Sequence, residues 1–250
     1  MTALVTGASG GLGRAVAVAL AEAGHDVGVH YRGDEAGAAA TAARVRAAGC
    51  RAATLHADLA VDDADALDRA CDVLLDACTE ALAAPDVVVL NAFPQDLTPW
   101  PDLDTATWDL SHRGGLRPTA ALLVRATARM GPGGVVVLVG SIEGLRAARA
   151  HAPYAVAKAA VHHLTGAAAS EVGRRGIRVV GVAPGLVARE GLEQAWPEGV
   201  ERFRRASALG RPVTPEEVAA VVAFLASPAA SGITGTTLAV DAGWSTSPGW

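Results

Sequence analysis

Short runs of β-branched residues alternate along this chain with longer, alanine-rich segments. Two of the runs, VVVL at 87–90 and VVVLV at 135–139, are apolar on both faces, as expected for strands that helices cover on both sides. Strands that alternate with helices are joined by right-handed crossovers and form a parallel sheet. The sequence therefore predicts an α/β fold, in which a doubly wound parallel sheet of seven strands carries helices on both faces.

No internal repeat, low-complexity linker or domain boundary divides the chain, so we expect residues 1–250 to form a single domain. The expected strands lie at 2–6, 26–31, 51–56, 86–90, 134–140, 177–182 and 236–240. The expected helices lie at 11–23, 35–48, 62–80, 105–129, 152–174 and 215–226.

The segment 186–214 has no strong strand pattern and precedes the last expected helix. It contains Trp196, Phe203 and several arginines. Ligands of doubly wound sheets bind beyond the carboxyl ends of the strands, and this segment follows such an end. We therefore expect it to be a lid insertion on the substrate side.

Composition narrows the range of partners. The 250 residues carry a net charge of −5 without a basic stripe, which argues against nucleic acid. No apolar run approaches the ~20 residues that span a bilayer, and the first residues lack the features of a signal peptide. Cys50, Cys71 and Cys78 are odd in number and lack metal-site spacing, so we expect free thiols in a reducing cytoplasm, and no bound metal.

The segment VTGASGGLG follows the first expected strand and opens the first expected helix. Gly7, Gly11 and Gly13 permit a tight turn and a close approach of the backbone to a pyrophosphate, to which the helix N-terminus offers free N–H groups. An ordinary glycine-rich turn has the same composition, but the position between a strand and a helix favours dinucleotide binding. Ser9 and Leu12, which lie among these glycines, belong to the predicted site.

The end of the second strand indicates which dinucleotide would bind. An acidic residue there would bind the ribose 2′-hydroxyl of NAD and repel a 2′-phosphate. The chain has Tyr31 followed by Arg32, whose guanidinium suits a phosphate, so NADPH is favoured and NADH is less favoured. Two alternatives stay open: Asp34 and Glu35 lie close enough to reach a hydroxyl, and Arg32 has the properties of a solvated surface charge.

Asp58 ends the third expected strand and Leu59 follows it. The Asp58 carboxylate is placed to accept a hydrogen bond from an adenine amino group. Aspartate also caps helix N-termini, and both roles stay open for this residue. We include Asp58 and Leu59 among the expected cofactor-binding residues.

The segment PYAVAK places Tyr154 and Lys158 four residues apart at the start of a helix, so that they share one face. A nearby ammonium favours the phenolate and should lower the pKa of the tyrosine, which could then exchange a proton with a carbonyl or an alcohol. Ser141 ends the fifth strand, and its hydroxyl could orient the substrate oxygen. Each residue alone also has an ordinary structural interpretation.

The glycine loop, the serine and Tyr-x-x-x-Lys at this separation, and APG after the sixth strand together resemble the short-chain dehydrogenase/reductase family. The resemblance covers residues 2 to about 243 and implies a Rossmann-type fold with Ser141, Tyr154 and Lys158 as catalytic residues. It further implies that Lys158 binds the nicotinamide ribose, and that Pro184, Gly185 and the Val187 backbone lie beside the nicotinamide.

The family usually carries a fourth catalytic residue, an asparagine that holds a water between the lysine and solvent, in the helix after the fourth strand. Here Gly115 occupies that position, and no asparagine lies anywhere in 105–130. Gly114, Gly115 and Pro118 are expected to bend the helix, because proline has no N–H to give to the preceding turn. We expect the site to have repacked around Gly115, for instance with a side chain from the SIEG turn at 141–144.

A second departure follows the fourth strand. The family usually shows Asn-Asn-Ala-Gly there, whereas this chain has Leu90-Asn91-Ala92-Phe93. Asn91 remains, can brace the central strands and is included in the cofactor site. Phe93 replaces a glycine that lets the cofactor approach, so its ring must turn aside or cover the adenosine side of the cleft.

These features favour a biosynthetic, NADPH-dependent oxidoreductase that reduces a ketone, or a related C=O or C=N group, with Tyr154 as proton donor. Alternatives are a pteridine-reductase-like enzyme and a catalytically weak, nucleotide-binding homologue. A small-molecule substrate is expected near Phe93, Glu143, His151 and Trp196, although each could equally serve packing. The family resemblance also implies a homo-oligomer, either a tetramer or a dimer.

Overall fold

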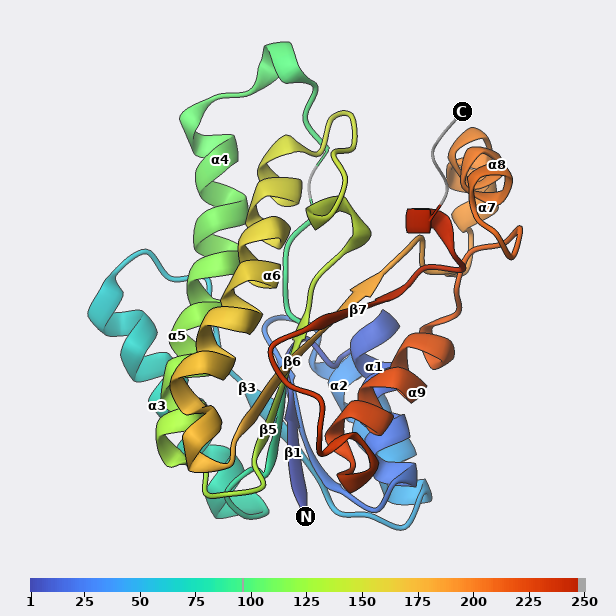
Figure 1. Cartoon of the computed structure of the whole chain (residues 1–250). Coiled ribbons are helices and arrows are strands. Elements are labelled where there is room, and N and C mark those ends of the chain that lie inside the picture. The colour runs from blue at the N-terminus through green and yellow to red at the C-terminus, as the bar shows by residue number, and fades with distance from the viewer. Residues whose placement is uncertain (96, 247–250) are drawn as a thin grey trace.

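A computed structural model describes residues 1–95 and 97–246. All strand pairs in the described chain are parallel, and they form one sheet in the order β3-β2-β1-β4-β5-β6-β7 (Figure 1). The chain therefore has the predicted Rossmann-type sheet of seven strands. The strands are β1 (Thr2–Val5), β2 (Asp26–Tyr31), β3 (Ala52–His56), β4 (Val87–Leu90), β5 (Val135–Val139), β6 (Arg178–Pro184) and β7 (Thr237–Val240).

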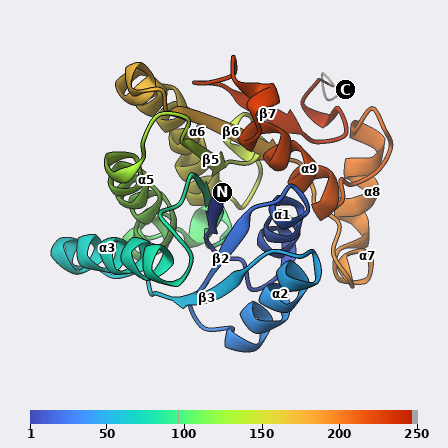
Figure 2. The same cartoon turned by 90° about the horizontal axis from the view of Figure 1, so that it is seen from below.

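Helices cover both faces of the sheet, as the view from below in Figure 2 shows. Strand β4 explains why: Val87 and Val89 belong to one buried apolar cluster, whereas Val88 and Leu90 belong to the cluster on the opposite face. One face carries α3 (Ala64–Ala81), α5 (Arg117–Arg129) and α6 (Ala152–Val172), and the other carries α1 (Gly11–Glu22), α2 (Glu35–Ala47) and α9 (Pro215–Ala226).

Every strand and helix predicted from the sequence is present, with ends that move by one or two residues. The segment 186–214 contains two short helices that the sequence pattern did not indicate, α7 (Leu192–Ala195) and α8 (Pro197–Ala206). In the described part of the chain, no helix combines the length and apolar character needed to cross a membrane.

The helix expected at 105–129 is interrupted at the predicted place. It consists of α4 (Thr105–Ser111), a π-helical turn η2 (His112–Leu116) and α5. The Arg117 N–H donates to the carbonyl of His112, five residues earlier, as in a π-helix. Pro118 follows directly and has no N–H for the Gly114 carbonyl, so an ordinary α-helical ladder could not continue through this turn.

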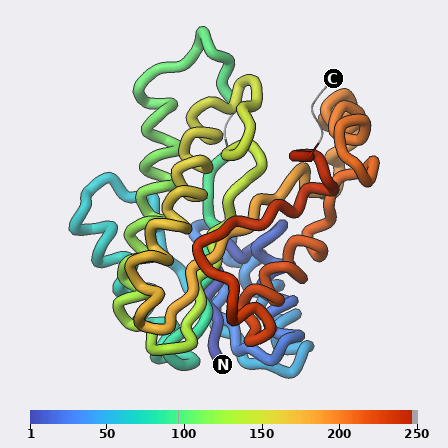
Figure 3. The backbone as a smooth tube through the Cα atoms, in the orientation of Figure 1, coloured from blue at the N-terminus to red at the C-terminus, as the bar shows by residue number. Residues whose placement is uncertain are grey.

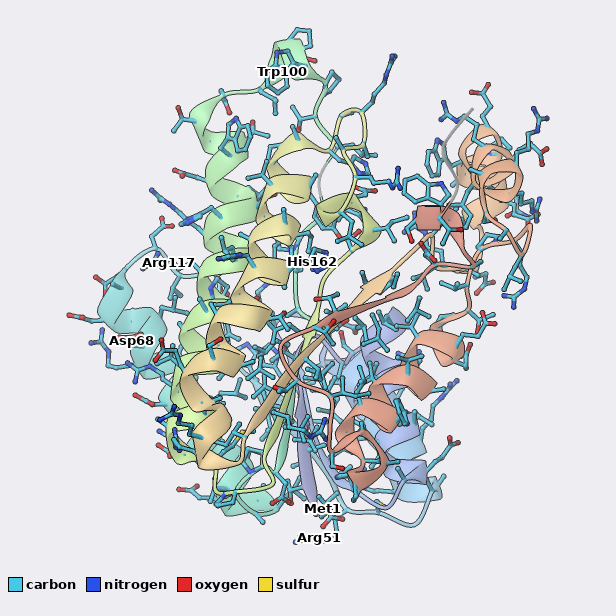
Figure 4. The ribbon with its side chains drawn as sticks, viewed as in Figure 1. Met1, Arg51, Asp68, Trp100, Arg117 and His162 are labelled. Carbon is cyan, nitrogen blue, oxygen red and sulfur yellow. The ribbon has the colours of Figure 1, made fainter. Side chains whose placement is uncertain are left out.

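The segments that follow β4 and β5 rise together beyond the carboxyl edge of the sheet. Figure 3 shows the tube climbing from β4 to a tip at η1 (Trp100–Asp102) before it returns through α4, beside the start of α6. The Thr98 N–H donates to the Ala150 carbonyl at 2.8 Å and joins the two segments. Trp100 stands at the tip, 72% exposed (Figure 4).

Candidate active site

The glycine loop between β1 and α1 has the shape that the sequence predicted. Gly7 and Gly11 have φ angles of +63° and +51°, which side-chain-bearing residues rarely adopt. A Cβ on Gly13 would lie 2.2 Å from the Gly7 carbonyl oxygen, so this close approach requires glycine. A Cβ on Gly10 or Gly11 would meet no atom within 4 Å, so this side of the loop is open.

The N-terminus of α1 beside this loop is suited to an anion. Gly10 is the N-cap and provides no side-chain cap, and the first turn of α1 contains no acidic residue. The first N–H groups of such a helix have no partner within the helix and carry partial positive charge. The loop and the helix end therefore fit a phosphate group.

Two polar residues hold the glycine loop to the sheet. Asn91 Nδ2 donates to the carbonyls of Thr6 at 3.0 Å and Gly7 at 3.2 Å, which is the bracing role predicted for it. His30, which the sequence analysis did not single out, accepts the Gly7 N–H at Nδ1 (3.1 Å), and its Nε2 lies 3.1 Å from the Ala57 carbonyl. Burial lowers the pKa of His30 to about 4, so the ring is neutral and can accept this bond.

The end of β2 exposes Arg32, which makes no ion pair within residues 1–95 and 97–246. The Asp34 carboxylate is the N-cap of α2 and accepts the Gly37 N–H at 2.8 Å, so this carboxylate is already engaged. A second guanidinium, that of Arg14, donates to the Ser9 carbonyl and, at 3.0 Å, to Thr41 Oγ1. Arg14 and the Asp34 carboxylate therefore lie together beside the loop, and the exposed Arg32 follows the end of β2.

Asp58 is not a helix cap. Its carboxylate accepts the Ala60 N–H at 2.8 Å in a local turn, whereas α3 begins at Ala64 and is capped by Asp63. The capping alternative for Asp58 is wrong because the turn delays the helix by several residues. Leu59 is buried in the apolar core.

Ser141, Tyr154 and Lys158 come together where β5 ends and α6 begins. Ser141 is 8% exposed, and its Oγ accepts the Glu143 N–H at 3.1 Å. The Ser141 hydroxyl faces Tyr154 closely enough to lower the pKa of its phenol. Lys158 is 2% exposed, and its Nζ donates to the Val139 carbonyl at 2.8 Å and lies 5.5 Å from the centre of the Tyr154 ring.

The acid–base properties of this cluster differ from those predicted. Burial raises the pKa of Tyr154 to about 12, with a further rise from the Glu143 charge, and the Ser141 hydrogen bond offsets only part of it. Burial lowers the pKa of Lys158 to about 7. The sequence predicted a lowered tyrosine pKa because the helical spacing shows the lysine but not the depth at which both groups lie. The phenol is therefore held in its protonated form.

Phe93 lies in this cluster. Its ring centre is 3.7 Å from Lys158 Nζ and 5.7 Å from the centre of the Tyr154 ring, which it meets edge-on. A Cβ on Gly115 would lie 2.4 Å from the tip of the Phe93 ring. Of the two placements expected for the ring, it adopts the first and turns aside, toward the lysine. One expectation is corrected: Phe93, and not a side chain of the SIEG turn, fills the space at Gly115.

Glu143 and His151 form a pair beside the tyrosine. The His151 Nδ1 is hydrogen-bonded to Glu143 Oε2, and the imidazole meets the Tyr154 ring edge-on with centres 6.2 Å apart. Trp196 lies elsewhere: its ring packs on Gly199 and faces Arg202, within its own segment.

His162 supports Ser141 from below, one turn after Lys158 on α6, and is labelled in Figure 4. Its Nε2 lies 2.8 Å from the Ser141 carbonyl, and its ring occupies the space over Gly140 and Gly144, where a Cβ would lie 2.3 Å and 2.7 Å from ring atoms. Burial is the main reason that the pKa of His162 is lowered. In the sequence, the only indication that a ring packs here is the pair of glycines, Gly140 and Gly144, on either side of residues 141–143.

The turn after β6 presents free backbone groups. Val187 pairs with Val213 in a parallel bridge, in which the Ala188 N–H and the Leu186 carbonyl take the hydrogen bonds, at 2.7 Å and 3.0 Å. The N–H and C=O of Val187 itself therefore point to the other side. A Cβ on Gly185 would lie 2.8 Å from Asp241 Cα, so this turn requires glycine.

Comparison with known proteins agrees with this geometry. Residues 7–245 match the protein family described as enoyl-(acyl carrier protein) reductase. An uncharacterized oxidoreductase of Bacillus subtilis, YmfI, is 34% identical over 97% of this chain and 98% of its own length. The chain belongs to the short-chain dehydrogenase/reductase family, and it is an oxidoreductase.

Two solved structures of the family are named as ketone reductases. LanV, an angucycline C-6 ketoreductase with bound NADP, superimposes with a TM-score of 0.90 at 31% identity and covers 98% of this chain and 95% of its own. LugOII is described as a promiscuous reductase that catalyses keto-reduction at C1 during lugdunomycin biosynthesis. It superimposes with a TM-score of 0.89 at 32% identity, and the match covers 97% of both chains. The likeness extends over the whole sheet and both helical layers.

Proposed function

We propose that this protein is an NADPH-dependent ketoreductase of a biosynthetic pathway, with Tyr154 as the proton donor. The observation that supports it most is the cluster of the buried Ser141 and Lys158 with the half-buried Tyr154, which lies at the carboxyl edge of the sheet near a glycine loop that suits an anion. The ketoreductase names of LanV and LugOII point to the same reaction.

The residues present fit a dinucleotide phosphate. The open face of the glycine loop and the end of α1 suit the pyrophosphate, and Arg32 with Arg14 suits the 2′-phosphate that distinguishes NADPH. The outward N–H and C=O of Val187 suit a carboxamide. We assign the cofactor to Gly7, Ser9, Gly11, Leu12, Gly13, Tyr31, Arg32, Asp58, Leu59, Asn91, Tyr154, Lys158, Pro184, Gly185 and Val187.

In the mechanism, the bound dinucleotide supplies the hydride. Ser141 and Tyr154 hold the ketone oxygen by hydrogen bonds and orient the carbonyl. Tyr154 gives its phenolic proton to that oxygen as negative charge develops on it. Because the pKa of Tyr154 is raised to about 12, the proton is present throughout the physiological range. The Lys158 amine, 5.5 Å from the centre of the Tyr154 ring, would stabilise the phenolate that remains.

The substrate side is assigned to Phe93, Glu143 and His151, because their side chains face Tyr154. The segment 186–214 is assigned as a lid over this side, with α7 and α8 standing across from the start of α6 (Figure 1). Trp196 contacts its own helix, so we assign it to the lid and not to the substrate surface.

The test is NADPH oxidation, followed by absorbance, with a panel of polycyclic ketones and pterins. Turnover of ketones above pterins supports the proposal, and the reverse order favours a pteridine reductase. Tight NADPH binding, read from quenching of tryptophan fluorescence, without turnover of any panel member would instead identify a nucleotide-binding homologue that lacks activity.

We also propose that the chain forms a homo-oligomer through α5 and α6. Val124 on α5 and Val156 on α6 are 67% and 57% exposed. Exposed apolar residues on neighbouring helices are suited to pairing with a second copy. A stable monomer in light scattering at micromolar concentration would contradict this.

A further inference from the structure

Phe93 is held by three separate parts of the fold. It follows β4 and Asn91, its face covers the Lys158 amine, and its edge meets Tyr154. Its tip points at Gly115, where a Cβ would lie 2.4, 2.5 and 2.7 Å from three ring carbons. These distances are far below a normal van der Waals contact, so the ring occupies its place only because residue 115 has no side chain.

The π-helical turn packs against both Phe93 and Pro94. A Cβ on Gly114 would lie 3.1 Å from Pro94 Cγ, so both glycines of the turn face the Phe93–Pro94 pair. The Gly115 carbonyl accepts the Thr119 hydroxyl at 2.8 Å, which satisfies this buried backbone group inside the disturbed helix. The turn therefore leaves room for the Phe93 ring at residue 115, and the backbone carbonyl there still has a hydrogen-bond partner.

Of the two aromatic rings near the lysine amine, Phe93 is the nearer, at 3.7 Å against 5.5 Å for Tyr154. Of the three N–H groups of Nζ, one donates to the Val139 carbonyl at 2.8 Å. No carboxylate among residues 1–95 and 97–246 forms an ion pair with this amine. The negative face of an aromatic ring attracts an ammonium at such a distance, so the ring favours the charged form of this buried amine and holds it in place where charged partners are missing.

We propose that Phe93 is a positioning residue for Lys158 and that Gly115 is glycine so that the ring can enter. The ring holds the amine beside Tyr154 and keeps water from its α4–α5 side, which leaves the remaining N–H groups to act toward the bound ligands. This inference rests on the proposed function for the role of Lys158, but the position of the amine can be measured without turnover.

Lys158 is the only lysine in the 250-residue chain. Protein labelled with ¹³C at lysine Cε therefore gives one side-chain NMR signal, and its titration reports the pKa of this amine directly. The titratable groups near the amine are Tyr154 and His162 on α6, with Glu143 on η3 (Ile142–Gly144) beyond Tyr154. Strand β5 presents the Val139 carbonyl, and the segment after β4 presents the uncharged Phe93 ring.

Three variants separate positioning from space-filling: Phe93→Leu, Gly115→Ala and the double variant. Phe93→Leu keeps an apolar side chain but removes the ring face, and Gly115→Ala drives a methyl group into the ring. In the double variant the methyl group occupies space that the ring tip has left, so the melting temperature should return to within about 2 °C of the parent.

In the double variant, the melting temperature should recover, but the turnover and the pKa of Lys158 should not. In Phe93→Leu and in the double variant, kcat with NADPH and ketone should be reduced roughly tenfold or more, because the amine has lost its support. The pKa of Lys158 should also fall by roughly 0.5 or more, since apolar packing remains while the attraction to the ring is lost.

A double variant that regains both the melting temperature and turnover within about threefold of the parent would show that the ring only fills space, and would overturn the proposal. An unchanged lysine titration in Phe93→Leu would overturn it as well. A parent protein without ketone turnover would instead refute the proposed function, and the titration would still decide the role of Phe93.

Discussion

The Lys158 amine lies 5.5 Å from the centre of the Tyr154 ring, and burial shifts the pKa of both groups toward their neutral forms. The two shifts act together: a protonated phenol is ready to donate, and the buried amine can gain charge when a phenolate forms beside it. These shifts support the proposed direction, which is reduction of a ketone and not removal of a proton from an alcohol.

Lys158 should make the stability of the protein depend on pH. The pKa of its amine is about 7 in the folded protein and 10.5 in the unfolded chain, so between these values the unfolded chain binds one more proton. The free energy of unfolding should therefore rise with pH, by about 2–3 kcal/mol from pH 7 to pH 9. Urea titrations at several pH values measure this slope.

The matched control is Lys158→Met, which keeps an apolar stem of similar length and should remove most of the slope. The comparison is best made below pH 9. Above it, Cys71 and Cys78, whose pKa burial raises to about 11, lower the stability because the unfolded chain releases protons that the folded protein keeps. A slope that persists in Lys158→Met would show that the amine is already charged in the folded protein.

Tyr154→Phe should reduce ketone turnover by roughly 10²–10⁴-fold, because the proton donor is lost while the ring contacts with Phe93 and His151 remain. NADPH affinity, measured by fluorescence titration, should change little. Lys158→Ala should harm both turnover and affinity. Turnover of Tyr154→Phe within tenfold of the parent would remove Tyr154 from the acid role.

Arg32→Asp should reverse the preference for NADPH over NADH. Loss of one charged contact to the 2′-phosphate corresponds to about 1.5–3 kcal/mol, or roughly a tenfold to a hundredfold change in relative kcat/KM. Arg44→Asp makes the same change of charge on the exposed surface of α2 and should leave the preference unaltered. A parent that already prefers NADH would show that Arg32 does not bind a phosphate.

The parts of the site that the sequence predicted are those encoded locally. The glycine loop and the Tyr154–Lys158 spacing each lie within one turn or helix, so their geometry follows from a short stretch of chain. The interrupted helix was also predictable, because the low helix propensity of glycine and the missing N–H of Pro118 act within the same segment.

The parts that the sequence did not predict depend on contacts between distant elements. His30 reaches Gly7 from the neighbouring strand, and Phe93 meets Gly115 across the gap between β4 and the π-helical turn. Periodicity reports which residues are buried but not which of them touch. The predicted direction of the Tyr154 pKa shift was wrong for the same reason, because desolvation depends on the packing of several elements.

Gly115→Asn, which restores the residue usual in the family, should destabilise this protein. Its Cβ would lie 2.4 Å from the Phe93 ring, and overpacking of this kind costs about 1–3 kcal/mol, more than the few tenths gained in helix propensity. Gly166→Ala on α6 is the control: a Cβ there would have an ordinary contact at 3.6 Å, so stability should rise by about 0.5–1 kcal/mol.

The measurements are melting temperature and turnover of Gly115→Asn, made together. Both should fall, because the new side chain displaces the ring from the Lys158 amine. The Phe93→Gly/Gly115→Asn double variant removes the clash and should be more stable than Gly115→Asn alone, since the amide then enters space that the ring has vacated. A single Gly115→Asn variant that is both more stable and roughly tenfold faster than the parent would show that Phe93 does not depend on the glycine.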